Sequence, residues 1–193
     1  MTIPIAAWRA LVPSLWAIWL IYWVVAALRT KQIAREEDIR SRLSHHVPLI
    51  LGAVLLGVPR IFGATLEQRY HPHTFGWFLA GAVLVAIGLA FSILARAWLG
   101  GNWSSMVTLK QDHELIRSGP YAIVRHPIYT GLLVALLGTA IVVGKWRALI
   151  GLALFVIAIV RKLTIEERFM SEQFGEAYAR YREQVPALLP FLI

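Results

Sequence analysis

The stretch RHPIYTGLLVALLGTAIVVGKWRALIGLALFVIAIVRKLTIEERF, residues 125–169, contains two apolar runs separated by only two residues. The runs, residues 128–143 and 146–160, are each slightly short of the roughly 20 residues that cross a hydrocarbon core. Because only Gly144 and Lys145 lie between them, we expect the two runs to form a tight helical hairpin. This hairpin predicts a helical fold embedded in a membrane.

The rest of the chain agrees with a membrane protein. Of its 193 residues 58% are apolar, and the mean hydropathy is +0.63, which is too apolar for a soluble domain. Three more apolar stretches, residues 5–28, about 47–66 and 74–99, raise the expected number of membrane segments to about five. The first stretch is longer than the apolar part of a signal peptide, so we expect it to be retained.

The net charge of +8 predicts an orientation in the membrane and not a nucleic-acid partner, because the basic residues lie in loops and no recognition motif accompanies them. Basic residues are concentrated in cytoplasmic loops. They cluster here in two loops, at Arg29, Lys31, Arg35, Arg40 and Arg42, and at Lys110, Arg117 and Arg125. Both loops are therefore predicted to be cytoplasmic, with the amino terminus outside and the carboxyl terminus inside.

These patterns predict one all-α, multi-pass domain over residues 1–193. Residues 1–99 are expected to form three membrane helices, and residues 100–193 a polar loop, the hairpin and a cytoplasmic carboxyl-terminal helix. That helix is expected to begin in RKLTIEERFMSEQFGEAYARYREQ, residues 161–184. With no cysteine, the chain has no disulfide, no cysteine-ligated metal and no cysteine nucleophile. The sequence leaves the oligomeric state open.

Polar residues at both ends of the hairpin are candidates for chemistry. Pro127 suits the first turn of a helix, with His126 near its cap. Glu166 and Glu167 follow directly on an apolar run, where carboxylates are costly unless a cation lies nearby. They are expected either to pair with neighbouring basic residues on a solvated face or to bind a cationic ligand. The loop KQDHELIRSGPYAIV, residues 110–124, is either a connector or the lining of a cavity.

Taken together, these pieces resemble the isoprenylcysteine carboxyl methyltransferase family, within the wider group of phospholipid methyltransferases. The resemblance extends from residue 100 to the carboxyl-terminal end. It is carried by GNWSS, HELIRSGPYAIVRHPIYTG, the tandem EE, FGEAYARYREQVP and LPF, in that order. The resemblance implies S-adenosylmethionine as the cofactor and a lipid-like substrate in the bilayer.

The resemblance also implies which residues hold this cofactor. The implied set is His113, Glu114, Leu115 and Ile116, largely through backbone groups, Tyr121 nearby, the motif residues His126, Pro127, Ile128 and Tyr129, and the acidic residue Glu166. If the register shifts by one, Glu167 takes the place of Glu166. We expect the glutamate to bind the cofactor's ammonium, and Arg125 or His126, aided by the helix start at Pro127, to bind its carboxylate.

The implied reaction is methylation of the carboxylate of a prenylated cysteine or a similar lipid-linked acid. A carboxyl group with a reference pKa of about 3.5 is already ionised at neutral pH, so neither a general base nor a metal is expected. Lys162 stands where the family commonly has an arginine, and we expect it to hold the acceptor carboxylate, with Arg161 sharing or taking over that role. The alternative is N-methylation of phospholipid ethanolamine, which requires a base and an anionic acceptor site; the two cations favour the carboxylate.

Overall fold

The computed structural model describes residues 5–28, 33–35, 38–100, 109–110 and 115–190, and most of these are helical. A 3₁₀ helix, η2, covers Gly119–Ala122, and two short strands pair with each other. The α-helices are α1 (Ile5–Ala27), α2 (Ile39–Gly57), α3 (Gly63–Leu66), α4 (Phe75–Leu99), α5 (Pro127–Val143), α6 (Trp146–Phe174) and α7 (Glu176–Gln184).

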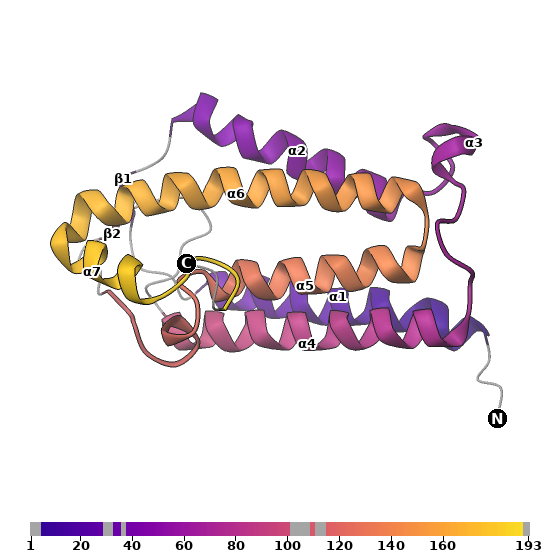
Figure 1. Ribbon diagram of the computed structural model, residues 1–193, viewed down its shortest axis with the longest axis horizontal. Helices are drawn as coiled ribbons and strands as arrows, with labels where there is room; N and C mark the ends of the chain where they lie inside the picture. The colour runs from indigo at the N-terminus through magenta and orange to yellow at the C-terminus, as the bar shows by residue number, and fades with distance from the viewer. Residues whose placement is uncertain (1–4, 29–32, 36–37, 101–108, 111–114, 191–193) are drawn as a thin grey trace.

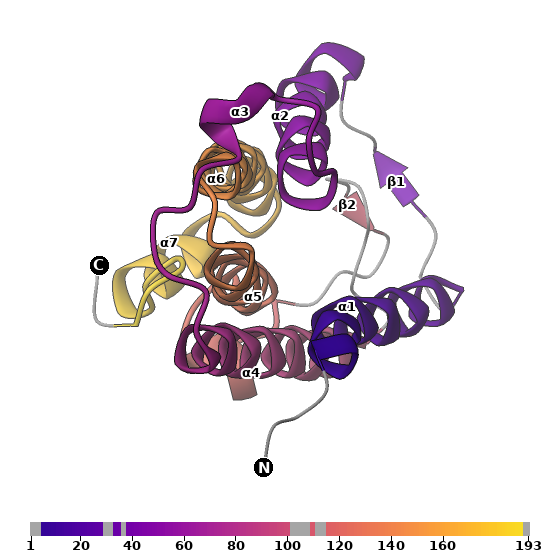
Figure 2. The same ribbon diagram turned by 90° about the vertical axis from the view of Figure 1, so that its right-hand side faces the viewer.

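Five long helices form a bundle along the long axis of the molecule (Figure 1). In chain order α1, α2, α4, α5 and α6 run in alternating directions, so the amino end of α5 and the far end of α6 lie at the same end (Figure 1). Viewed along the bundle, α5 lies between α4 and α6, with α1 beside α4 and α2 beside α6 (Figure 2). The start of α5 is thus held by neighbours on two sides.

The predicted all-α membrane fold is confirmed in outline. Within the described ranges, three helices are long and apolar enough to cross a membrane: α1, α4 and α6. Helix α5 is apolar but has only 17 residues. The observed limits of α1, α4 and α5 lie within one residue of the predicted ones.

The predicted hairpin is also confirmed, with Gly144 and Lys145 as its turn. Gly144 has a φ of 63°, a left-handed conformation that glycine adopts without steric cost, and its N–H donates to the Ala140 carbonyl at 2.8 Å. Lys145 then precedes the first residue of α6.

The prediction for the second apolar stretch, about residues 47–66, was wrong at both ends. Helix α2 already begins at Ile39, where the Asp38 carboxylate accepts a hydrogen bond from the Arg40 N–H at 3.2 Å and caps the helix. It ends at Gly57, because Pro59 removes a backbone donor and restricts the residue before it. Leu66 belongs to the separate short helix α3.

The predicted boundary between the last membrane segment and the charged helix was wrong as well. Helix α6 continues without a break from Trp146 to Phe174, and its 29 residues make it about 43 Å long. Its second half must therefore extend beyond a hydrocarbon core of about 30 Å. The break comes instead at Gly175, with a φ of 50°, after which α7 turns back toward the bundle (Figure 1).

Two short strands are the departure, among the described residues, from a purely helical prediction. Strand β1 (Ile33–Arg35) pairs antiparallel with β2 (Leu109–Lys110), with an irregular register. The first strand lies between α1 and α2 and the second between α4 and α5. Their pairing places Arg35 and Lys110, one residue from each predicted basic loop, at the same end of the bundle.

Helices α4 and α5 approach closely through facing glycines. A Cβ atom on Gly81 would lie 2.6 Å from the Gly138 carbonyl oxygen, and one on Gly138 would lie 2.5 Å from the Gly81 oxygen. Gly88 and Gly131 face each other in the same way two turns further along. Small residues let membrane helices make close backbone contact, so these pairs fix the position of α5 against α4.

At the end of the bundle opposite to β1 and β2, a cluster of polar contacts joins the loop after α2 to the turn of the hairpin. Arg147 is 5% exposed and donates to the Leu55 and Leu56 carbonyls near the end of α2, while its Nε lies 3.0 Å from Glu67. Lys145 also pairs with Glu67, and its hydrogen bond holds the pKa of that carboxyl below the ordinary value. These hydrogen bonds and ion pairs link α2, α6 and the loop between α2 and α4.

The α4–α5 contact predicts a contrast between two glycines of the same helix. Gly81→Ala should lower the free energy of unfolding by about 1–3 kcal/mol, because the new methyl group meets backbone atoms of α5. Gly76→Ala should change it by less than about 0.5 kcal/mol, since the nearest atom is 4.0 Å away. Thermal unfolding in detergent measures both, and equal effects would contradict the proposed close packing.

Candidate functional site

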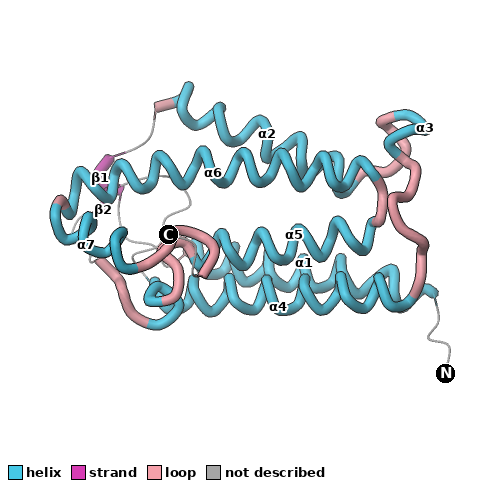
Figure 3. The backbone as a smooth tube through the Cα atoms, viewed as in Figure 1, coloured by secondary structure: helices cyan, strands magenta, loops and turns pink. Residues whose placement is uncertain are grey.

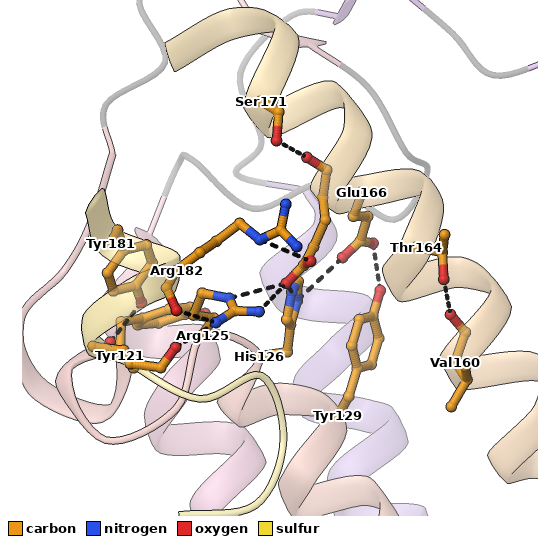
Figure 4. A network of polar contacts seen from close by, with 12 residues as sticks. Tyr121, Arg125, His126, Tyr129, Val160, Thr164, Glu166, Ser171, Tyr181 and Arg182 are labelled. Carbon is orange, nitrogen blue, oxygen red and sulfur yellow. Dashed lines mark hydrogen bonds and ion pairs between the residues drawn. The ribbon is translucent and has the colours of Figure 1, made fainter. Parts of the chain in front are cut away.

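The residues that the sequence singled out gather at the end of the bundle where α5 begins (Figure 4). Three segments meet there: the start of α5, the polar second half of α6, and α7 with the chain that follows it. Figure 4 shows Arg125, His126 and Tyr129 reaching from the α5 side toward carboxylates on α6.

The turn before α5 is anchored to α4 by an indole ring. Gly119 has a φ of 59°, and any Cβ there would collide with the ring of Trp98. The Trp98 indole N–H donates to the Ser118 hydroxyl at 3.1 Å. The turn therefore needs glycine both for its backbone conformation and for its contact with the indole.

Tyr121 follows in this turn and is buried between α4 and α7. Its hydroxyl donates to the Ala95 carbonyl at 3.4 Å, and its own carbonyl accepts from the Tyr181 hydroxyl. Burial raises the pKa of Tyr121, and burial raises the pKa of Tyr181 to about 12. Both phenols therefore remain hydrogen-bond donors at neutral pH. Tyr121 lies in the wall of the site with its hydroxyl directed at α4.

Helix α5 starts as predicted, with Pro127 as its first residue and His126 just before it. The His126 ring stacks on Tyr129, with ring centroids 5.8 Å apart. Its Nε2 lies 3.3 Å from Glu167 and its Nδ1 lies 3.7 Å from Glu166. The imidazole thus lies between the two adjacent carboxylates.

Glu167 is the more enclosed of the two glutamates. Arg125 donates to its Oε1 from Nε at 2.9 Å and from Nη2 at 2.7 Å, and Arg182 of α7 lies 3.5 Å from its Oε2. The side chains of Arg125 and Glu167 are 9% and 12% exposed. A paired, partly desolvated carboxylate of this kind holds segments together.

Glu166 points toward Tyr129, whose hydroxyl donates to its Oε1 (Figure 4). Its side chain is 24% exposed, twice the value for Glu167. Of the two carboxylates, Glu166 is therefore the more accessible to a ligand.

The two predicted acceptor cations point to different places. The Lys162 ammonium lies 5.8 Å from the centroid of the Tyr129 ring, within the range of a cation–π contact. The Arg161 Nε donates instead to the Ser44 hydroxyl on α2 at 3.0 Å. The structure therefore brings Lys162 to the site and directs Arg161 at α2.

The other residues predicted to hold the cofactor fall into two groups. Leu115 and Ile116, which precede the turn at Gly119, and Ile128, in the first turn of α5, are half-buried. His113 and Glu114 lie outside the described residues. Over the ranges that the structure describes, no group of three or more His, Asp or Glu side chains is arranged to hold a metal ion.

Sequence reasoning missed the contribution of α7 and the chain after it. Tyr178 and Tyr181 are buried at 2% and 3% exposure, three residues apart on one face of α7. Arg182, next to this face, reaches Glu167. The sequence signal for this packing was the pair of tyrosines next to an arginine, but the sequence did not indicate which residues they would contact.

The sequence that builds this site matches a known protein family. The sequence model of the family described as "Phospholipid methyltransferase" matches residues 77–177, which include most of α4, all of α5 and α6, and the start of α7. The chain belongs to the phospholipid methyltransferase family. The match contains Tyr129, Lys162 and both glutamates of the site.

Within the phospholipid methyltransferase family, the chain is similar to curated isoprenylcysteine enzymes. It is 33% identical over 101 residues to protein-S-isoprenylcysteine O-methyltransferase of Schizosaccharomyces pombe, covering 51% of this chain and 43% of the relative. Protein-S-isoprenylcysteine O-methyltransferase B of Arabidopsis thaliana is 26% identical over 152 residues, covering 77% and 75%. The human protein-S-isoprenylcysteine O-methyltransferase is 31% identical over 134 residues, covering 66% and 47%. The matches span less than half the length of the yeast and human proteins, and they confirm the resemblance expected from the sequence.

The arrangement predicts that the two glutamates differ in their effect on stability. Glu167→Gln should lower the free energy of unfolding by at least about 2 kcal/mol, because it leaves the Arg125 guanidinium without its carboxylate. Glu166→Gln should cost less than half as much, since an amide oxygen still accepts from Tyr129. Thermal unfolding without ligand is the measurement, and the reverse order would refute this division.

Proposed function

We propose that this protein is a membrane methyltransferase that transfers the methyl group of S-adenosylmethionine to the carboxylate of a prenylated cysteine or a similar lipid-linked acid. One observation carries the proposal. Tyr129 has the Glu166 carboxylate at its hydroxyl and the Lys162 ammonium near its ring. A negative group for the methyl donor and a positive group for the acceptor thus both lie next to one side chain.

The residues of the site fit the charged groups of S-adenosylmethionine. Glu166 would bind the ammonium, and the amino end of α5 would favour the carboxylate through its N–H groups and dipole. Arg125 and His126, the two side chains predicted for the carboxylate, both contact Glu167 in the structure, which leaves the helix start as the main group for that role. Half-buried Leu115, Ile116 and Ile128 supply apolar walls near the same turn.

Lys162 supports a carboxylate acceptor. An ammonium group beside the donor site attracts an anionic acceptor and repels a cationic one. Lys162 and Glu166 are four residues apart, so they share one face of α6 and both lie next to Tyr129. The fork of an arginine is replaced by a single point charge, so the lysine orients the acceptor less strictly.

Catalysis on this proposal rests on positioning and on removal of water. The bound cofactor supplies an electrophilic methyl group on a sulfonium, and attack by the acceptor oxygen yields a methyl ester and a thioether without moving a proton. Lys162 holds the acceptor carboxylate, and Glu166 and the start of α5 hold the donor, so that both reactants are fixed relative to each other. The buried Tyr121 and Tyr178 exclude water from the wall of the site.

We further propose that α2 and α5 also cross the membrane, which makes five crossings in a single unit of residues 1–193. The alternating helix directions and the 17 apolar residues of α5 support this. The basic loops that carry β1 and β2 lie at the site end, which supports a cytoplasmic site with the start of α1 outside. The lipid substrate would then reach Lys162 from the cytoplasmic leaflet.

Purified protein assayed with S-adenosylmethionine and a farnesylcysteine analogue tests the division of roles. Glu166→Gln should weaken binding of S-adenosylhomocysteine, measured by calorimetry, by about tenfold to a hundredfold, because it removes a charge from the ammonium site. Lys162→Met should leave that affinity unchanged and raise the KM for the acceptor, with Lys162→Arg restoring it. Arg161→Met is the matched control and should affect the acceptor less. Equal loss of donor and acceptor binding in Lys162→Met would contradict the assignment.

The family name makes phospholipid N-methylation the second candidate, and the fate of the methyl group distinguishes the two. With tritiated methyl donor and native membranes, a carboxyl methyltransferase should place the label in base-labile esters. Label in methylated derivatives of phosphatidylethanolamine would contradict the proposed acceptor while leaving the donor site intact.

A further inference from the structure

The segment that follows α7, residues 185–188, lies across the amino end of α5, and we call it the tail strap. Figure 3 shows the chain turning back from α7 toward the start of α5. All four successive carbonyls of the strap accept hydrogen bonds from this region. The pairs are Arg125 Nη1 to Val185, Arg125 N to Pro186 at 2.8 Å, His126 N to Ala187 at 3.0 Å and Thr130 Oγ1 to Leu188 at 2.7 Å.

Arg125 connects the tail strap to the carboxylates of α6. Its Nε and Nη2 bind Glu167, and its Nη1 donates to the main-chain carbonyls of Arg182, at 3.2 Å, and of Val185. One side chain, 9% exposed, therefore touches α6, the end of α7 and the strap together. Arginine suits this position because its planar guanidinium carries five donors in a fixed geometry.

The strap contacts the residues that immediately precede the first turn of α5. The N–H groups of Arg125 and His126 donate to strap carbonyls, and Pro127, the first residue of the helix, has no N–H. The His126 ring in turn lies 3.7 Å from Glu166 and stacks on Tyr129. The strap thus lies next to the residues of the proposed donor site.

We propose that the tail strap closes the cofactor site and that Arg125 is the positioning residue that holds it closed. The inference rests on the proposed function and deepens it. The cofactor is exchanged when the strap leaves the start of α5, whereas the acceptor binds at Lys162, one turn of α6 before Glu166, and does not depend on the strap. Arg125 touches neither reactant and acts through the strap and Glu167.

A cross-link tests the closure directly, because the chain contains no cysteine of its own. Thr130→Cys and Leu188→Cys place a pair of thiols across the strap, and a short bis-maleimide joins them. The protein is loaded with radiolabelled S-adenosylhomocysteine before cross-linking, and release is followed after dilution. Release should be slower by at least about tenfold than in the same protein without the reagent. Unchanged release, or failure of the pair to cross-link, would overturn the proposal.

Substitution of Arg125 separates a positioning role from a structural one. Arg125→Gln should speed release of S-adenosylhomocysteine by about tenfold, with Arg125→Lys between it and the wild type, because lysine keeps the charge but loses the fork. The KM for the farnesylcysteine analogue should stay within about threefold of the wild-type value. Equal loss of donor and acceptor binding would mean that Arg125 only stabilises the fold.

The two proposals fail in different ways. A wild-type protein that binds no S-adenosylhomocysteine would overturn the proposed function, and this inference with it. A wild-type protein that binds it and methylates the analogue, but releases it at the same rate after cross-linking, would overturn the tail strap alone.

Discussion

The end of the bundle that holds the candidate site depends on the neutralisation of two adjacent carboxylates. These are Glu166 and Glu167, which lie just beyond the apolar half of α6. A carboxylate that is partly removed from water is costly unless cations and donors surround it. Glu167 receives Arg125 from the start of α5, His126 beside it and Arg182 from α7. The position of α7 follows from this pairing together with its two buried tyrosines, and the tail strap follows from α7.

Two neighbouring residues of one helix do different work here because they point in directions about 100° apart. Glu167 points toward Arg125 and α7, while Glu166 points toward Tyr129, on the same face as Lys162. Arg125 neutralises Glu167, whereas Glu166 accepts from the Tyr129 hydroxyl, on the face of α6 that also carries Lys162. A tandem pair of glutamates thus supplies both an internal anchor and an accessible carboxylate.

Hydropathy was sufficient for α1, α4 and α5, because a membrane helix must be apolar along nearly its whole length and its ends are marked by polar residues or glycine. It failed for α2, whose first turns carry Arg40 and Arg42 and read as loop, and for α6, whose helix continues through a charged stretch. Hydropathy marks only the apolar part of a helix, and these two helices include charged stretches beyond that part.

The sequence named candidate residues for the site but not their contacts. The resemblance named Tyr129, Lys162 and the glutamates, and the contacts in which Glu166 and Glu167 differ depend on which face of α6 meets α7. The motif FGEAYARYREQVP extends into the tail strap, but the contacts of the strap were not predictable, because they are made by main-chain carbonyls that every residue carries.

The central claim is that Glu166, and not Glu167, binds the ammonium of the methyl donor. A double-mutant cycle tests it, with affinities of S-adenosylhomocysteine and an analogue lacking the amino group measured for the wild type, Glu166→Gln and Glu167→Gln. The account predicts that removal of the amino group weakens binding to the wild type and to Glu167→Gln but has no further effect in Glu166→Gln. Coupling of the amino group to Glu167, or equal losses in all three proteins, would contradict it.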